Sequence, residues 1–598
     1  MEDQTMKAII SILFIIHISL LTTHITNAQI IHVPADYSTI QAGIEAANFW
    51  GDTVLVAEGT YTENIDFRGK LITVASHFIM DGDTNHINNT IIDGSSPANP
   101  DEGSVVYFRN YEDTTAMLCG FTITGGSGTW VVGPQTRAAG GVFIDNAGAR
   151  IIHNHITGNH ITGNASGSGA GIAAGDLTSD ATVIIRNNRI TNNTIDVSNI
   201  AEGGGMVIYC NGIIEDNIIA HNEISTQTGI AVGAGLRCIG ASDPREIYIS
   251  GNVISHNLLS CGSGSVYAGG GGLQAFKCIG TIRNNHIIFN ENYSDFGSIG
   301  GGMHVAFCDT SLLLENNLIA DNVANSSTSG VSWGGGICMH SSSVRLINNV
   351  ITRNDAEEGA GIHVHYNLDG PIEVINNTIA WNQWDAIGGA IYLMDADAIV
   401  LNSILWNGTE EIHLSGGNAE VAYSNIMGGW PGEGNIDVDP DFIDDTCHID
   451  EYSPCVDFGA DSIELSGIWY YAPDVDFDGT PRPYGSGRID IGADECDIFT
   501  GIDKFKIQHS KFNIQTYPNP TGGISHFAFR ISQYQWVSLK IYDLHGREVA
   551  TVLDEMMPAG EHVVQYDMTG LPEGVYVVEL WAKGIARMAT CKLVVASR

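Results

Sequence analysis

Histidine, arginine and aromatic residues recur in the middle of this chain, in the short strand-like stretch that follows each of several glycine-rich corners. The first and third residues of these stretches are apolar, so the second and fourth should point together to the outer face. Imidazole groups suit proton transfer, and aromatic rings suit stacking against sugars. The residues of this predicted outer strip are Arg237, Gln274, His304, His340, His363, His365 and Tyr392.

Three interpretations of this strip are open from the sequence. Exposed strand positions ordinarily accept histidine and aromatic side chains, so the strip has a purely structural interpretation. A sugar-binding strip and a catalytic strip are the two alternatives. His340 and His365 are expected one coil apart, where they could share a metal ion, but the sequence shows no third ligand.

The clearest metal-binding pattern is D-x-D-x-D-G, with its carboxylates at Asp474, Asp476 and Asp478. Three carboxylates at this spacing suit a hard cation such as Ca²⁺, and the glycine permits the turn. An EF-hand loop would carry a glutamate where this chain has Gly485, so the motif is not a complete EF-hand. A solvated acidic turn is the alternative, and any calcium bound here would be structural.

A repeated N-x-I-x-x-N pattern positions the strip, because it recurs at steps of 25 to 35 residues. Its copies are written in strand alternation, as in residues 344–347 and 372–375. This combination predicts a parallel β-solenoid, in which each coil buries its apolar face against its neighbours. The asparagines that open the copies are Asn154, Asn188, Asn217, Asn252, Asn285, Asn317, Asn349, Asn377 and Asn402.

The glycines and asparagines of the repeat have structural roles in this interpretation. Glycine permits the left-handed backbone and the close approach that a tight corner needs. Asparagine tolerates the left-handed region, and its amide can bond the same amide one coil away, which makes a ladder. With coils about 4.8 Å apart, Asn317, Asn349 and Asn377 are expected to stack at one corner.

The N-terminus predicts export. Lys7 precedes an apolar run, and small residues before Gln29 predict a signal peptide over residues 1–28. No other stretch has the length and hydropathy of a transmembrane helix, so none is expected in the mature chain. Ser38-Thr39-Ile40-Gln41 predicts a capping box and a helix that covers the first coil.

Residues 33–47, V-P-A-D-Y-S-T-I-Q-A-G-I-E-A-A, lead into G-D-T-V-L-V-A-E-G-T-Y-T-E-N-I and later G-F-T-I-T-G-G. These segments resemble the entry and an early coil of right-handed parallel β-helix proteins of the pectin-lyase-like superfamily. The resemblance implies such a β-helix over residues 29–440. The paired aspartates of the pectin-methylesterase and polygalacturonase types have no counterpart at matching positions, and no exposed Lys–Arg pair indicates a lyase base.

Two further segments resemble known modules. S-N-I-M-G-G, S-P-C-V-D-F-G-A and D-I-G-A-D-E are similar to the closing region of bacterial surface β-helix proteins of the choice-of-anchor-Q type, which implies a closing region at 441–500. After a linker at 501–512, residues 513–598 resemble the C-terminal sorting domain of the type IX secretion system. Their short alternating strands independently predict a small β-sandwich. The resemblance implies export through the periplasm of a Gram-negative bacterium, with the secretion machinery as partner.

Eleven cysteines in 598 residues do not make a disulfide scaffold. Cys210, Cys278 and Cys308 fall at equivalent strand ends, which indicates stacked buried thiols rather than bridges. Cys447 and Cys455 are close enough in sequence to pair in an oxidising compartment, and the sequence leaves their state open.

The net charge of the chain limits which classes of partner it can bind. The net charge is −42, and residues 501–598 are nearly neutral, so the acidic field belongs to residues 29–500. Nucleic acid is excluded as a partner, and a polyanionic glycan would need bridging divalent cations.

The sequence therefore predicts an all-β, secreted or cell-surface protein. It is expected to bind or process an extracellular polysaccharide or a cell-surface glycan. The alternative is a non-enzymatic surface adhesin or structural protein. An enzymatic chain would be of the polysaccharide lyase or glycoside hydrolase kind, although the sequence identifies no catalytic motif.

Overall fold

The computed structural model describes residues 28–496 and 514–595, apart from short segments at 133–134, 177, 179, 242, 263–266, 296, 327–329, 409, 485–486, 518–522, 532–534, 544–546, 558–559, 573 and 583–586. The predicted signal peptide, except Ala28, and the predicted linker at 501–512 lie outside the described residues. The chain forms two compact units, Met1–Cys496 and Asp497–Arg598.

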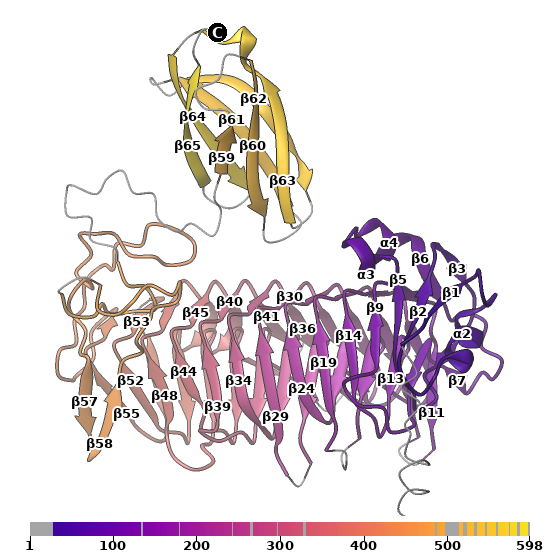
Figure 1. Cartoon of the computed structure of the whole chain (residues 1–598). Helices are drawn as coiled ribbons and strands as arrows, with labels where there is room; N and C mark the ends of the chain where they lie inside the picture. Colours follow the sequence, from indigo (N-terminus) through magenta and orange to yellow (C-terminus); the bar gives the residue numbers. More distant parts are fainter. Residues whose placement is uncertain are drawn as a thin grey trace, which may run out of the picture. The chain divides into compact units, whose positions relative to one another are not determined.

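Three long parallel sheets form the first unit, and successive coils add one strand to each sheet in turn (Figure 1). This arrangement confirms the predicted parallel β-helix. Sheet A contains β1 (Ile30–Val33), β2 (Trp50–Val56), β5 (Leu71–Ser76), β9 (Met117–Cys119), β14 (Ala149–Ile152), β19 (Thr182–Arg186), β24 (Asn211–Glu215), β29 (Arg245–Ser250), β34 (Cys278–Arg283), β39 (Leu312–Glu315), β44 (Arg345–Ile347), β48 (Ile372–Ile375), β52 (Ala398–Leu401) and β55 (Ala419–Ala422).

Sheet B follows sheet A in each coil. It contains β3 (Gly59–Tyr61), β6 (Thr90–Asp93), β10 (Thr122–Thr124), β15 (His155–Thr157), β20 (Arg189–Thr191), β25 (Ile218–Ala220), β30 (Val253–Ser255), β35 (His286–Ile288), β40 (Leu318–Ala320), β45 (Val350–Thr352), β49 (Thr378–Ala380), β53 (Ile404–Trp406) and β56 (Asn425–Ile426).

Sheet C completes the coil and carries the predicted strip. It contains β4 (Ile65–Asp66), β8 (Val106–Phe108), β13 (Val142–Ile144), β18 (Ile172–Ala174), β23 (Met206–Ile208), β28 (Leu236–Ile239), β33 (Leu273–Phe276), β38 (Met303–Ala306), β43 (Ile337–His340), β47 (Ile362–His365), β51 (Ile391–Met394) and β54 (Ile412–Ser415). Inward-facing aliphatic side chains of all three sheets merge into one core that runs from Ile31 to Ile426.

Two asparagine ladders hold the coils together. In the predicted ladder, the backbone N–H and the side-chain amide of Asn317 both donate to Oδ1 of Asn349, at 3.0 and 2.9 Å, and Asn349 donates in the same way to Asn377. The stacking of these three residues is confirmed. A second ladder runs five residues further along each coil, from Asn159 to Asn407.

The last member of the predicted series is wrong. Ser403, not Asn402, continues the ladder, because its hydroxyl accepts the N–H of Asn377 at 3.1 Å. Asn402 lies one position earlier, where its amide contacts Asn376 and the carbonyl of Ala460. The ladder step from Asn377 to Ser403 is therefore 26 residues, one more than the spacing of the motif suggests.

Helix α2 (Ile40–Ala46) covers the first coil, as expected. Its N-cap is Thr39, which accepts the N–H of Ala42 at 3.2 Å, so the predicted box starting at Ser38 is one residue out of register. The N–H groups of Ile40 and Gln41 donate to the carboxylate of Glu63. Two further short helices, α3 (Phe78–Asp81) and α4 (Asn85–Asn89), lie between sheets A and B of the second coil.

A fourth sheet leaves the solenoid after sheet B and returns before sheet C; we call it the side arm. Its outgoing strands are β16 (His160–Gly163), β21 (Thr194–Val197), β26 (Glu223–Thr226), β31 (Leu258–Cys261), β36 (Glu291–Ser294) and β41 (Val323–Ser326). Its returning strands are β12 (Thr136–Ala138), β17 (Ser166–Ser168), β22 (Ala201–Glu202), β27 (Ile230–Val232), β32 (Tyr267–Gly269), β37 (Gly297–Ile299) and β42 (Val331–Trp333).

The side arm buries a small core of its own. At its ends lie β7 (Glu102–Gly103), β11 (Gly128–Val131), β46 (Asp355–Glu358) and β50 (Gln383–Ile387). Outgoing residues such as Ile195 and Leu259 pack with returning residues such as Ala231 and Ala268. Two strand layers therefore face each other, and the returning layer leads directly into the glycine corners before sheet C.

The closing region wraps over the last coils. Trp430 packs against the end of the solenoid core, while the hairpin of β57 (Ser462–Leu465) and β58 (Ile468–Tyr471) places Tyr470 on the outer face of sheet A. Cys447 and Ala493 pack on the outer face of sheet B. Cys447 and Cys455 are both buried free thiols, as are Cys210, Cys278 and Cys308.

The second unit consists of two antiparallel sheets that share one hydrophobic core. One sheet contains β59 (Ile514–Tyr517), β60 (Ile524–Ile531) and β63 (Gly560–Asp567), and a 3₁₀ turn, η1 (Met568–Gly570), follows it. The other contains β62 (Glu548–Met557), β61 (Gln535–Asp543), β64 (Gly574–Ala582) and β65 (Arg587–Val595). This layout is that of a small β-sandwich, as expected from the alternating strands.

Candidate functional site

Parallel pairing places the predicted strip in two columns on the outer face of sheet C. The second strand position runs through Arg237, Gln274, His304, Cys338, His363 and Tyr392, and the fourth runs through Phe276, Ala306, His340 and His365. The sequence pattern therefore assigned the correct face of the strand. The surroundings of the two columns differ, because the side arm covers only one of them.

The second-position column is not exposed, contrary to the prediction. Gln274, His304, His363 and Tyr392 are between 0% and 5% exposed, and only 12% of the Arg237 side chain is exposed. Residues of the returning arm strands, namely Glu202, Tyr267 and Trp333, contact this column and hide it from solvent. We call this second-position column (Arg237, Gln274, His304, Cys338, His363 and Tyr392) the sealed column.

Polar contacts link the first half of the sealed column, although Nε of Arg237 and Oε1 of Gln274 have no hydrogen-bond partner among the described residues. Arg237 forms an ion pair with Glu202, the last residue of β22. The amide of Gln274 lies 2.9 Å from Nδ1 of His304, and the hydroxyl of Tyr267 from β32 lies 3.0 Å from Nε2. Burial lowers the pKa of His304 to about 3, so this imidazole is neutral and serves packing.

Ring stacking dominates the second half of the sealed column. The rings of Trp333, His363, Tyr392 and His413 stack in sequence, with centroids 4.8–4.9 Å apart and interplanar angles of 7–14°. Both ring nitrogens of His363 are buried without a hydrogen-bond partner among the described residues, and Glu358 Oε2 lies 3.9 Å from Nε2. Burial, followed by the charges of His365 and His340, lowers the pKa of His363 to about 3.

The fourth column forms an open surface together with the residue that follows it in the turn. Phe276 and Phe307 lie 5.3 Å apart, Phe307 and His340 5.7 Å, His340 and His365 5.1 Å, and His365 and Tyr366 4.2 Å, as ring centroids. Phe307 is 39% exposed and Tyr366 is 45% exposed. We call Phe276, Phe307, His340, His365 and Tyr366 the aromatic ridge.

The ridge histidines are neutral at ordinary pH. Burial lowers the pKa of His340, and burial together with the charge of His340 lowers the pKa of His365. Neutral imidazoles beside phenylalanine and tyrosine give a surface of flat rings with few charges, which suits stacking against a sugar ring. The ridge crosses four successive strands of sheet C, from β33 to β47.

Several residues around the two columns escaped the sequence analysis. Three of them stand immediately before a glycine corner: Glu202, Trp333 and Glu358. This position in the sequence could have identified them as residues that cover the column. Phe307 and Tyr366 stand immediately after the strand, at backbone φ angles of 55° and 63°. Strand alternation stops before both positions, so it gave no information about them.

The predicted calcium ligands do not form one cluster. Asp476 is 1% exposed, and its carboxylate accepts backbone N–H groups from Asp478, Thr480 and Glu495 at 2.7–2.9 Å. Asp474 is exposed, and Asp478 contacts His448 instead. The motif therefore forms a turn that its central carboxylate fastens to the chain near Glu495.

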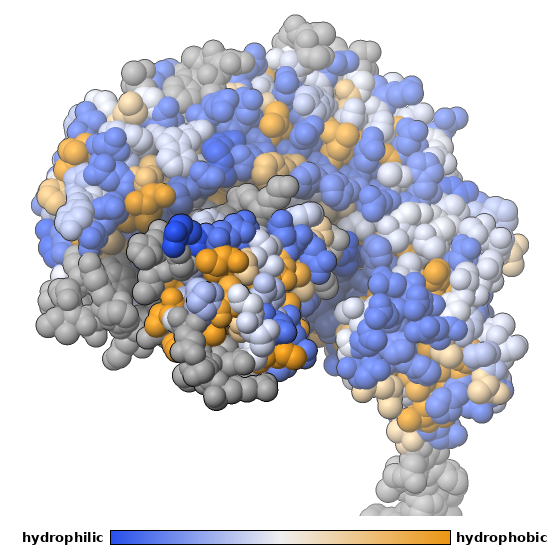
Figure 2. Space-filling model, turned by 90° about the horizontal axis from the view of Figure 1, so that it is seen from above, coloured by the Kyte–Doolittle hydropathy of each residue, from blue (hydrophilic) through white to orange (hydrophobic). Residues whose placement is uncertain are grey.

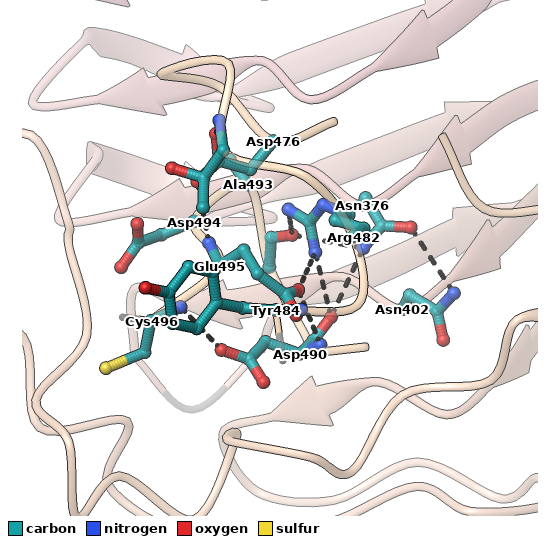
Figure 3. Close-up of polar contacts among 12 residues, drawn as sticks. Asn376, Asn402, Asp476, Arg482, Tyr484, Asp490, Ala493, Asp494, Glu495 and Cys496 are labelled. Carbon is teal, nitrogen blue, oxygen red and sulfur yellow. Dashed lines mark hydrogen bonds and ion pairs between the residues drawn. The ribbon is translucent and has the colours of Figure 1, made fainter. Parts of the chain in front are cut away.

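Figure 3 shows the polar network that follows this turn. The buried guanidinium of Arg482 donates to Glu495 at 3.2 Å and to the carbonyls of Asp490 and Gly492. The amide of Asn376, on the solenoid, donates to the same two carbonyls at 3.2 Å. The network anchors the closing region to the coils.

Figure 2 shows hydrophobic residues scattered among hydrophilic ones over the visible face of the solenoid. Among the described residues, no helix combines the length and apolar character needed to span a membrane.

Comparison with known proteins identifies the second unit. Residues 515–596 match the family of secretion system C-terminal sorting domains. The chain is therefore a secreted or cell-surface protein delivered by the type IX secretion machinery of a Gram-negative bacterium. No curated protein matches the chain.

One solved structure similar to the chain is the enzymatically active domain of tailspike protein 4 from bacteriophage CBA120. The identity is 13%, the match covers 86% of this chain and 59% of that chain, and the TM-score is 0.20. The chain thus spans less than two thirds of that protein. The strand pairing of the chain itself shows the parallel β-helix.

Proposed function

We propose that this secreted or cell-surface protein binds an extracellular polysaccharide or cell-surface glycan along the aromatic ridge. The observation that supports the proposal is the unbroken series of ring contacts from Phe276 to Tyr366, which continues across successive coils at an exposed edge. A single exposed aromatic residue would not support glycan binding, because isolated hydrophobic residues are normal on protein surfaces.

The spacing of the coils and the net charge of the chain limit the class of glycan that could bind. Parallel strands lie about 4.8 Å apart, close to the roughly 5 Å repeat of a sugar unit, so neighbouring coils can meet neighbouring sugars. The net charge of −42 disfavours a bare polyanion. A neutral glycan, or an acidic glycan whose carboxylates are bridged by calcium, fits the ridge better.

The sealed column favours binding over catalysis. Its histidines His304 and His363 are buried and neutral, so they lack both the access and the pKa that a general acid or base needs. The same observation supports the second candidate, a surface adhesin or structural protein without a glycan site. The two candidates differ in whether the ridge has a ligand.

Glycan-array binding with the mature protein, with and without calcium, tests the proposal. Phe307→Ala and Tyr366→Ala should each weaken binding of the best array ligand about tenfold, which corresponds to roughly 1.4 kcal/mol. Phe289→Ala is a matched control: Phe289 also follows a strand at φ 55°, is 44% exposed and stacks with His256, but lies outside the ridge. Equal affinities for wild type and both ridge variants would reject the ridge and favour the adhesin.

A further inference from the structure

Three side chains from separate parts of the closing region converge on one point. One ligand atom each from His448, Asp478 and Asp494 lies within 4.8 Å of the other two. Asp478 comes from the D-x-D-x-D-G turn, whereas His448 follows Cys447 and Asp494 follows the β-helix contact at Ala493. Only Asp478 belongs to the ligand set that the sequence predicted.

A fourth residue orients the histidine. Nδ1 of His448 lies 2.7 Å from Oδ2 of Asp444, and Nε2 lies 2.5 Å from Oδ2 of Asp478. A histidine that ligates a metal generally donates its other ring N–H to a carboxylate or carbonyl, which fixes the tautomer and the ring orientation. Asp444 supplies that contact, so Nε2 is the nitrogen directed at the cluster.

The third candidate ligand, the carboxylate of Asp494, is also held by a hydrogen bond from outside the cluster. Asp494 is half-buried, and Oδ2 accepts the N–H of Ile449 at 2.9 Å. Within the described residues Asp494 makes no hydrogen bond to a side chain. Asp444, Asp478 and Asp494 together bring three negative charges around one imidazole, which can carry only one positive charge. Arg482 is buried against Glu495, and Arg353, which contacts the carbonyl of Asp445, is paired with Asp321. A divalent cation would balance this excess of charge.

We propose that His448, Asp478 and Asp494 bind a divalent transition-metal ion of the Zn²⁺ type. One imidazole nitrogen and two carboxylate oxygens suit zinc, whereas calcium takes oxygen ligands in larger number. In the metal-free protein a proton between Nε2 and Asp478 occupies the place of the ion. The bound metal would join the segments around residues 444–449, 476–482 and 490–496, and its role would be structural.

Calorimetric titration of the chelator-treated full chain with ZnCl₂ tests the site. We expect one saturable site that Ca²⁺ does not fill. His448→Gln and Asp478→Asn should abolish it, and Asp444→Asn should weaken it 10- to 100-fold. Asp474→Asn is the matched control, because Asp474 is an exposed aspartate of the same turn that lies outside the cluster, and its affinity should equal that of wild type.

X-ray absorption of the zinc-loaded wild-type chain keeps the test independent of any variant that fails to fold. The spectrum should show imidazole nitrogen at about 2.0–2.1 Å together with oxygen ligands. Absence of saturable zinc binding, unchanged affinity in His448→Gln, or a spectrum without imidazole would each overturn the proposal.

Discussion

The sealed column and the fourth-position residues of the aromatic ridge lie on the same strands of sheet C, two positions apart in sequence. His363 in the sealed column is 0% exposed, while His365, two residues later, is half-buried beside the exposed Tyr366. Alternation places both side chains outside the solenoid core. Whether an outward side chain meets solvent depends on the side arm, which another part of each coil supplies.

The difference shows that one outer face can have a buried, structural half and an open half. In the sealed column, outward residues pack against the returning strands, as His363 does against Trp333. In the ridge, the rings contact each other and leave their edges or faces to solvent. The four predictions below either remove a feature that both columns share or change one column alone.

Asn349→Leu should give the largest effect, because the ladder sets the register of both columns. Asn349 is 0% exposed, accepts two hydrogen bonds from Asn317 and donates to Leu314, Ile347 and Asn377. Each buried polar group left unpaired costs about 1–3 kcal/mol, so the free energy of unfolding should fall by about 3 kcal/mol or more. Chemical denaturation measures the loss.

Asn325→Leu is the control for the ladder variant, because Asn325 is exposed on the side-arm strand β41. Its stability should stay within about 0.5 kcal/mol of wild type. Equal stability of Asn349→Leu and wild type would refute an internal ladder as the common support of the two columns.

Trp333→Ala should affect the sealed column next most strongly. The variant removes the ring that stacks on His363 at 4.9 Å and opens the column at that coil. The free energy of unfolding should fall by about 2 kcal/mol, somewhat less than for a fully buried tryptophan, since Trp333 is half-buried. Trp50→Ala, at a tryptophan that is 67% exposed, should change stability much less. Similar losses in both variants would argue against a sealing role.

Lowering the pH should reduce the free energy of unfolding through the sealed column more than through the ridge. This effect should be smaller than those of the two substitutions above. The unfolded chain protonates His363 near pH 6.5, whereas burial keeps it neutral in the folded protein down to about pH 3. The folded form therefore binds fewer protons in this window, and stability is complete above pH 6.5 and decreases as the pH falls toward 3. His363 should contribute a loss of up to about 1.4 kcal/mol per pH unit.

Urea unfolding between pH 7 and 5 measures this contribution. His363→Phe keeps a flat ring between Trp333 and Tyr392 but cannot titrate, so its stability should depend less on pH than that of wild type. His365→Phe, on the ridge, should change the dependence less, because His365 is half-buried. The same pH dependence in wild type and His363→Phe would contradict a buried neutral imidazole.

The sequence predicted the repeated part of the fold well, for a physical reason. Each coil meets a near copy of itself, so the ladder from Asn154 to Asn377 is visible as spacing alone. The predicted register is wrong at Asn402, because Ser403, one residue later, takes the ladder position. A repeated pattern predicts the register of a typical coil, but it does not predict where one coil departs from that register.

The candidate site was only partly predictable. Alternation identified the outward positions, including His340 and His365, but it could not show that the returning arm strand covers His304 and His363. The D-x-D-x-D-G motif was located correctly as a turn. The contact between Asp478 and His448 joins residues 30 positions apart in a region without repeats, and no local pattern reports such a contact.

A length series of oligosaccharides tests the account most directly. Using β-1,4-linked neutral oligosaccharides of two to eight units, from the series that binds best on the array, calorimetry should show affinity rising up to about four units and then levelling off, because the ridge crosses four coils about 4.8 Å apart. Phe307→Ala should shorten this rise, since Phe307 lies inside the ridge, while Phe289→Ala should leave the curve unchanged. Affinity independent of length, or identical curves for wild type and Phe307→Ala, would contradict glycan binding along the aromatic ridge.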